Sequence, residues 1–103
     1  MITRLWRGWA TGENAEAYKR LLRDEILPGI ARRLTEAYRR ARLFRRETEG
    51  GVEFLTILTF DSEDAIRSFV REDIEAANLP AKARALLGRF ETRAQHSREV
   101  PLR

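Results

Sequence analysis

The sequence of 103 residues contains no cysteine and only one histidine. The absence of cysteine excludes disulfides, thiolate catalysis and cysteine metal sites. No apolar run approaches the roughly 18 residues of a membrane-spanning helix. Arginines interrupt the first residues, where a signal peptide would have its apolar core. We therefore expect a cytoplasmic protein that does not bind a membrane and holds no metal, flavin or haem.

The length leaves room for one domain, residues 1–103, and so short a chain gains much from burying further surface in a subunit interface. The net charge is +4, and arginine supplies 18 of the 20 basic residues. We interpret the one local basic excess as a solvated face rather than a nucleic-acid site, because acidic residues are spread along the chain. This excess comprises Arg32, Arg33, Arg39, Arg40, Arg42, Arg45 and Arg46.

Residues 2–10 alternate large apolar and basic side chains, a pattern typical of a strand. Thr11 is placed to cap a long helix that follows. Apolar residues recur along this helix at spacings of three and four. They are Tyr18, Leu21, Leu22, Ile26, Ile30 and Leu34. Pro28 removes one backbone donor, which predicts a kink or a break in the helix.

Residues 38–46 and 52–60 are predicted to form a hairpin, because only a short turn with two glycines separates them. Asp61 or Ser62 is expected to cap the next helix. The predicted buried face of that helix consists of Ala65, Ile66, Phe69 and Val70. Pro80 opens a short helix, and residues 89–98 alternate again as a last strand.

The order strand, helix, strand, strand, helix, short helix, strand predicts an α+β, ferredoxin-like βαββαβ fold with a four-stranded antiparallel sheet. Both faces of the strand at 52–60 are apolar, whereas a face open to water normally carries polar residues. Val52, Phe54, Leu58 and Phe60 lie on one face, and Leu55 and Ile57 on the other. We therefore expect a homodimer in which two sheet faces pack together.

Several segments together are similar to the antibiotic biosynthesis monooxygenase-like family of dimeric α/β-barrel proteins. They are residues 2–9 (ITRLWRGW), 25–30 (EILPGI), 54–62 (FLTILTFDS) and 83–91 (ARALLGRFE), together with His96. The resemblance covers nearly the whole chain. It implies a cleft between sheet and helices that holds a small aromatic or otherwise apolar ligand. Enzymes of this family oxidise activated phenols or anthrones with molecular oxygen and without a metal or flavin, and other members degrade haem.

The haem-degrading branch of the family uses an asparagine, a tryptophan and a helical histidine that binds iron. In this chain the histidine lies in the last predicted strand, Phe69 occupies the tryptophan position, and residues 2–10 contain no asparagine. These departures argue against haem. Family members that oxidise aromatic polyketides also favour a tryptophan where this chain has Phe69.

His96 is the candidate catalytic residue, because the ordinary pKa of histidine suits proton transfer near neutral pH. Oxygen chemistry without a cofactor needs a base that deprotonates the phenolic substrate. If the last strand alternates regularly, Phe90, Thr92 and Ala94 share the face of His96. The alternative is a structural histidine that is hydrogen-bonded within the sheet.

The candidate ligand-contacting residues are Trp6, Trp9, Tyr38 and Phe69. The two tryptophans are predicted to lie on opposite faces of the first strand, so one of them is available to stack on a planar ligand. Packing in the core or in a dimer interface is the alternative role for both. Arg4 and Tyr38 are placed to orient a polar substituent, and the alternative is that both simply lie at the edge of the sheet.

Two other classes of function compete with a ligand-binding enzyme. The first is an interaction or structural dimer without catalysis. The second is an RNA-binding module, because RNA-recognition domains share this order of elements. Such domains need a basic, glycine- and aromatic-containing motif on the third strand, and here that strand carries Glu53 and no basic residue. We therefore expect no nucleic-acid partner.

Overall fold

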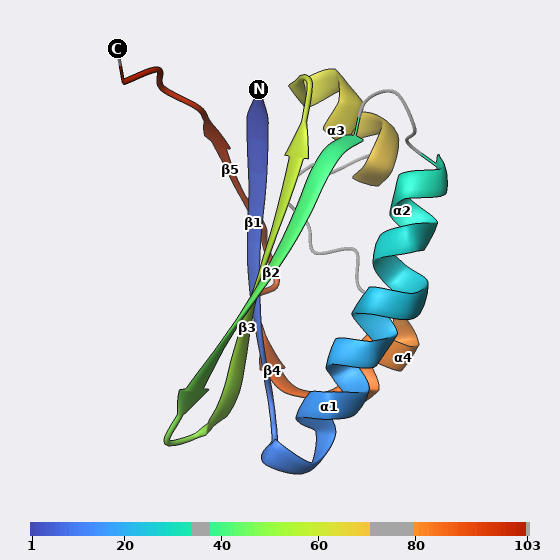
Figure 1. Ribbon diagram of the computed structural model, residues 1–103, viewed down its shortest axis with the longest axis vertical. Helices are drawn as coiled ribbons and strands as arrows, with labels where there is room; N and C mark the ends of the chain where they lie inside the picture. Colours follow the sequence, from blue (N-terminus) through green and yellow to red (C-terminus); the bar gives the residue numbers. More distant parts are fainter. Residues whose placement is uncertain (34–37, 71–79, 103) are drawn as a thin grey trace.

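The computed structural model describes residues 1–33, 38–70 and 80–102, and Figure 1 shows helices on one side of an antiparallel sheet. In chain order the elements are β1 (Ile2–Ala10), α1 (Gly12–Leu21), the π-helical turn η1 (Leu22–Ile26), α2 (Leu27–Arg33), β2 (Tyr38–Thr48), β3 (Gly51–Phe60), α3 (Glu63–Val70), α4 (Ala81–Leu86), β4 (Leu87–Phe90) and β5 (Gln95–Arg98). The elements follow the order that the sequence predicts as far as the last strand.

The strands are arranged as β2-β3-β1-β4, and β5 also pairs with β1. Along the central ladder Ile2 lies opposite Phe60 and Ala10 opposite Val52. The predicted hairpin is confirmed, since β2 pairs with β3 from Tyr38 to Thr48. This order, with β1 and β3 in the centre, is the ferredoxin-like arrangement, and the predicted fold class is confirmed.

The single last strand predicted at 89–98 is wrong, because the chain forms two short strands, β4 and β5, along the same edge of β1. Glu91 interrupts them. Its backbone N–H donates to the carbonyl of Arg7 (2.9 Å), and its carboxylate accepts from the Arg7 N–H (2.8 Å). One residue thus satisfies both backbone groups of Arg7, and the chain leaves the ladder before it resumes as β5. The regular alternation fails accordingly: Thr92 is exposed and Ala94 is buried.

The long helix begins as predicted, with the Thr11 hydroxyl accepting a hydrogen bond from the Asn14 N–H (3.3 Å). The break considered at Pro28 does not form, and the chain stays helical from α1 through α2. The irregularity is instead a π turn, in which the Leu27 N–H donates to the Leu22 carbonyl five residues earlier. Apolar residues spaced by four drift around an α-helix, which has 3.6 residues per turn. The extra residue of a π turn returns them to the same face. No helix in the described ranges is both long and apolar enough to cross a membrane.

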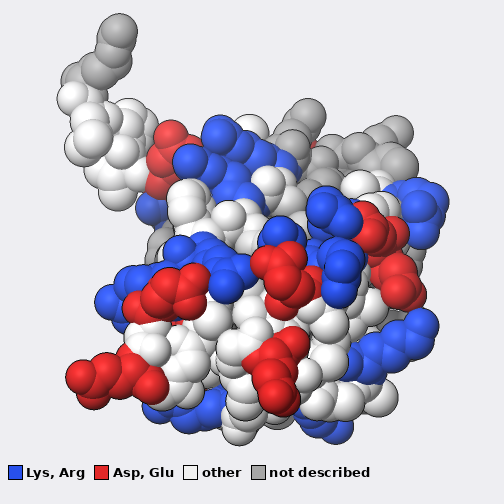
Figure 2. Space-filling view, turned by 60° about the horizontal axis from the view of Figure 1, so that its bottom comes forward, with Lys and Arg blue, Asp and Glu red and all other residues white. Residues whose placement is uncertain are grey.

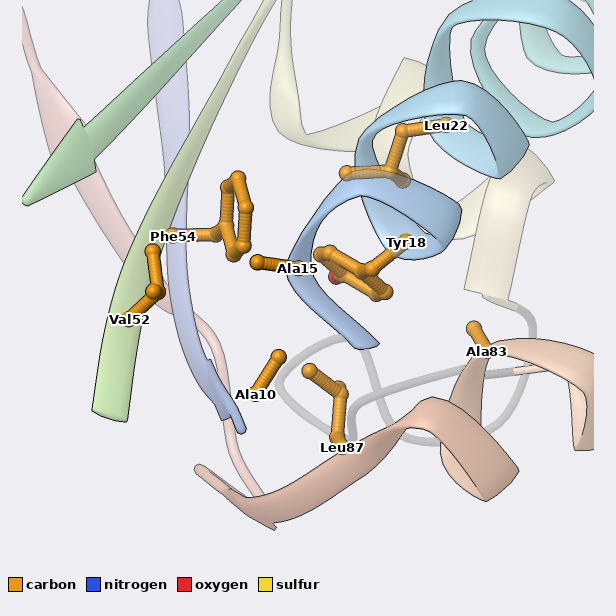
Figure 3. Close-up of a cluster of buried hydrophobic side chains, with 8 residues drawn as sticks. All are labelled: Ala10, Ala15, Tyr18, Leu22, Val52, Phe54, Ala83 and Leu87. Carbon is orange, nitrogen blue, oxygen red and sulfur yellow. The ribbon is translucent and has the colours of Figure 1, made fainter. Parts of the chain in front are cut away.

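Every second residue of β1 and β3 faces the helices, and apolar residues at these positions contribute to two buried apolar clusters. The Tyr18 cluster (Figure 3) consists of Ala10, Ala15, Tyr18, Leu22, Val52, Phe54, Ala83 and Leu87. The Ile66 cluster consists of Ile2, Leu58, Phe60, Ala65 and Ile66. Within α3, Ala65 and Ile66 are buried as predicted, and the Ser62 hydroxyl accepts from the Ala65 N–H as a cap (3.3 Å). The side chains of Phe69 and Val70 lie outside the described part of the structure.

The other face of the sheet, which we call the open face, is not covered by any of the described helices (Figure 1). Leu5, Leu55 and Ile57 lie half-buried at its centre, and Phe44 on β2 is 42% exposed. Apolar side chains on both faces of β3 are thus confirmed. Covering a sheet face of this composition with a second surface lowers the free energy, because its apolar side chains are removed from water.

The basic excess lies largely on β2, the outer strand, where Arg40, Arg42, Arg45 and Arg46 are exposed. Arg45 forms ion pairs with Glu16 (3.0 Å) and Glu47 (2.9 Å), and Arg46 pairs with a glutamate of β3. Basic and acidic side chains are intermixed on the face shown in Figure 2. Charged side chains on an outer strand oppose edge-to-edge pairing of sheets, which fits the solvated basic face that the sequence predicts.

Candidate functional site

Three polar side chains, Arg4, Thr56 and His96, lie on the helix-facing side of the sheet, and we call them the polar seam. Arg4 and His96 are directly opposite each other on β1 and β5. Thr56 lies on β3, two residue pairs further along, opposite Trp6. None of the three belongs to either apolar cluster, and on β3 the residues two positions away belong to different clusters. The seam therefore divides the apolar layer between sheet and helices.

The guanidinium of Arg4 is the buried charge of the seam. Its residue is 5% exposed, and Nη1 lies 2.8 Å from Nε2 of His96. A guanidinium only donates hydrogen bonds, so Nε2 accepts and the imidazole is neutral with its proton on Nδ1. Burial lowers the pKa of Arg4 to about 10, so the group keeps its charge at neutral pH. The seam thus combines a buried cation with a neutral histidine.

Two buried hydroxyls have no hydrogen-bond partner among the described residues, Oγ1 of Thr56 and the phenolic oxygen of Tyr18. Thr56 is 8% exposed. Tyr18 packs against Phe54, with ring centroids 5.0 Å apart, and burial raises its pKa. Buried polar atoms are nearly always hydrogen-bonded, so an orphaned hydroxyl marks a place for a water molecule or a polar ligand group.

Trp6 borders the seam on the helix-facing side of β1. Its indole N–H donates to the carbonyl of Glu91 (2.6 Å), and its ring lies 6.2 Å from that of Phe90. Gly8 makes room for this ring, because a Cβ there would lie 2.9 Å from Leu87 and 3.1 Å from Trp6. The hydrogen bond to Glu91 and the packing against Phe90 and Gly8 together fix the position of the indole ring.

Trp9 lies on the open face, and the prediction that the two tryptophans point in opposite directions is confirmed. The guanidinium of Arg89 stacks 3.9 Å from its ring centre. Both residues line a shallow concavity of about 910 Å³ at the hairpin end of the sheet. Trp9 is therefore separated from His96 by the thickness of the sheet.

Of the residues named from the sequence, the structure brings Arg4, Trp6 and His96 together on one face of the sheet. Tyr38 begins β2 opposite Phe60, and Phe69 lies in α3, but the side chains of both are outside the described part. Sequence reasoning missed Thr56. Its signal was available, because it is the one polar residue among the alternate, helix-facing positions 52, 54, 56, 58 and 60.

Within the described residues, no group of three or more histidine, aspartate or glutamate side chains is placed to hold a metal ion. The donor set of the seam is a guanidinium, an imidazole and a hydroxyl. A buried guanidinium repels a cation and attracts an anion.

No family model matches this chain, and no curated protein matches it. Among solved structures it is similar to the crystal structure of a dimeric ferredoxin-like protein from an uncultured marine organism. The TM-score is 0.60 at 11% sequence identity, with 93% of this chain and 90% of the other covered. This likeness supports the ferredoxin-like fold.

Proposed function

We propose that the protein is a homodimer that binds a small aromatic compound with an acidic hydroxyl group at the polar seam of each subunit. The observation that carries this proposal is the hydrogen bond between buried Arg4 and half-buried His96, between two apolar clusters. Apolar clusters on both sides favour a largely apolar ligand, and the guanidinium favours one that carries a negative charge. The orphaned Thr56 hydroxyl adds a further hydrogen-bonding group for such a ligand.

The dimer part of the proposal is supported by the apolar centre of the open face, formed by Leu5, Leu55 and Ile57. Arginines of the outer strand and Arg89 surround this centre. An apolar centre with an arginine-containing rim is the usual composition of a protein interface. The similar marine protein is described as dimeric, which agrees with this part of the proposal.

A reaction follows if the bound compound is an activated phenol or anthrone, as the family resemblance implies. His96 Nε2 is the base that takes the hydroxyl proton of a phenol or the methylene proton of an anthrone, and the Arg4 N–H that it releases then donates to the resulting oxyanion. The guanidinium stabilises this anion in a site of low dielectric constant, where electrostatic interactions are strong. In an anthrone, the electron-rich carbon of the anion then bonds to molecular oxygen, and the peroxide takes back the proton held by His96. Cleavage of the O–O bond, with loss of the second hydrogen of that carbon, leaves a ketone and releases water, so the substrate itself supplies the four electrons. We therefore propose a cofactor-independent monooxygenase.

Binding is tested by calorimetric titration with two probes of the proposed class, salicylate and 1-hydroxy-2-naphthoate. We expect wild type to bind at least one of them and Arg4→Gln to lose about tenfold or more in affinity, since a charge-assisted hydrogen bond contributes at least that much. Arg40→Gln, an exposed arginine of β2, is the matched control and should bind like wild type. Absence of wild-type binding to both probes would refute the ligand site.

Catalysis is tested separately, by oxygen consumption with anthrone as the substrate. His96→Gln should lower the rate about a hundredfold or more, the usual effect of a lost general base, and leave the dimer intact. If the variant keeps full activity, His96 is not the base. If wild type binds the probes and consumes no oxygen, the protein is a binding protein without this reaction. A melting temperature that falls with activity unchanged would assign His96 a structural role.

A further inference from the structure

The π turn η1 and the first residue of α2 supply two side chains, Ile26 and Leu27, that pack against both apolar clusters. No other residue is common to the contacts of the two clusters among the described residues. The polar seam separates these clusters along the sheet. Ile26 and Leu27, which pack against both clusters, therefore lie on the helical side where the two clusters approach each other.

The π turn explains why two consecutive residues can do this. Glu25 follows Tyr18 by seven positions, about two turns of an α-helix, so an α-helix without the π turn would place Glu25 on the buried face. In the structure Glu25 is exposed and pairs with Lys82 (3.2 Å), while Ile26 and Leu27 are half-buried. Single π turns within α-helices are frequent at functional sites. Pro28, which has no N–H to donate, follows directly.

We propose that Ile26 and Leu27 form the roof of the ligand site over the polar seam and that their size limits the length of aromatic ligand it accepts. This inference rests on the proposed function, because it places two specificity-determining residues opposite Arg4 and His96. The seam provides the polar contacts from the sheet, and the roof provides an apolar contact from the helix. Shortening a roof side chain then leaves room for a further part of an aromatic ring.

The test compares the affinities for salicylate and 1-hydroxy-2-naphthoate, which carry the same acidic group on one and two rings. Ile26→Ala and Leu27→Ala should shift the ratio of the two affinities toward the two-ring probe by about tenfold, the scale for a change of a few methyl groups in a pocket. Leu21→Ala is the matched control, since Leu21 is half-buried in α1 and packs against the Tyr18 cluster alone. Ile26→Val, a smaller change, keeps the test decisive if an alanine variant does not fold.

The outcomes distinguish the roof from the site itself. Suppose that wild type binds a probe and Arg4→Gln binds it more weakly, but folded Ile26→Ala and Leu27→Ala keep the wild-type ratio of affinities. That result would overturn the role of Ile26 and Leu27 and leave the proposed function unaffected. An equal shift in Leu21→Ala would also overturn it, because the effect would then not be confined to the residues above the seam. Failure of wild type to bind either probe would overturn both proposals.

Discussion

Substituting Thr56 by valine tests whether the polar seam is built for a ligand rather than for stability. Valine has nearly the shape of threonine and replaces the hydroxyl by a methyl group. Thr56 is 8% exposed, and its Oγ1 has no partner among the described residues. A buried hydroxyl without a partner costs about 1–3 kcal/mol, so we expect Thr56→Val to raise the free energy of unfolding by about 1–2 kcal/mol.

Urea denaturation followed by circular dichroism, at one fixed protein concentration, measures this change. The midpoint should rise at an unchanged slope, and the melting temperature should rise by about 5–10 °C for a domain of this size. Thr48→Val is the contrasting control, because the Thr48 hydroxyl donates to the Gly51 carbonyl (2.7 Å). That variant should lose about 1 kcal/mol, the net contribution of an ordinary hydrogen bond.

The same Thr56→Val protein should bind salicylate or 1-hydroxy-2-naphthoate more weakly than wild type if the hydroxyl contacts the ligand. A gain in stability combined with a loss in affinity would mean that the Thr56 hydroxyl lowers the stability of the free protein and serves to bind the ligand. A destabilisation of more than about 1 kcal/mol would refute the reasoning, because it would show that the hydroxyl has a stabilising partner.

Three further predictions follow from single features. Light scattering should give twice the 12.0 kDa of one chain, and Ile57→Glu on the open face should yield a folded monomer; a monomeric wild type would contradict the dimer. Because burial raises the pKa of Tyr18, the unfolded chain loses this proton first, and stability should fall as pH rises above about 10. Tyr18→Phe should reduce this loss of stability at high pH, which urea titrations between pH 8 and 11 would measure. An unchanged pH dependence in the variant would contradict the role of Tyr18. Gly51→Ala should destabilise by more than about 1 kcal/mol, since Gly51 has φ +136° and a Cβ there would lie 2.5 Å from the Ala10 carbonyl oxygen; Gly50→Ala, with open space around it, is the control and should change little.

Local patterns in the sequence determined most of the fold. The alternation at 2–10 and 52–60, the Thr11 cap and the turn at 49–51 each depend on residues close together in the chain, and each is observed. The last strand was predicted less well. Its interruption depends on Glu91 bonding to Arg7, 84 positions away, and no local pattern contains that pairing.

The candidate site shows the same division. The sequence by itself identified His96 as a candidate base, because a lone histidine is the side chain suited to proton transfer, and it placed the two tryptophans on opposite faces of β1. Only the tertiary structure decided that His96 bonds to Arg4, that Trp6 rather than Trp9 shares their face, and that Ile26 and Leu27 reach both clusters. These relations depend on strand register and on one extra residue in a helical turn. Register and helix phase are fixed by packing between distant segments, which the periodicity of one segment does not contain.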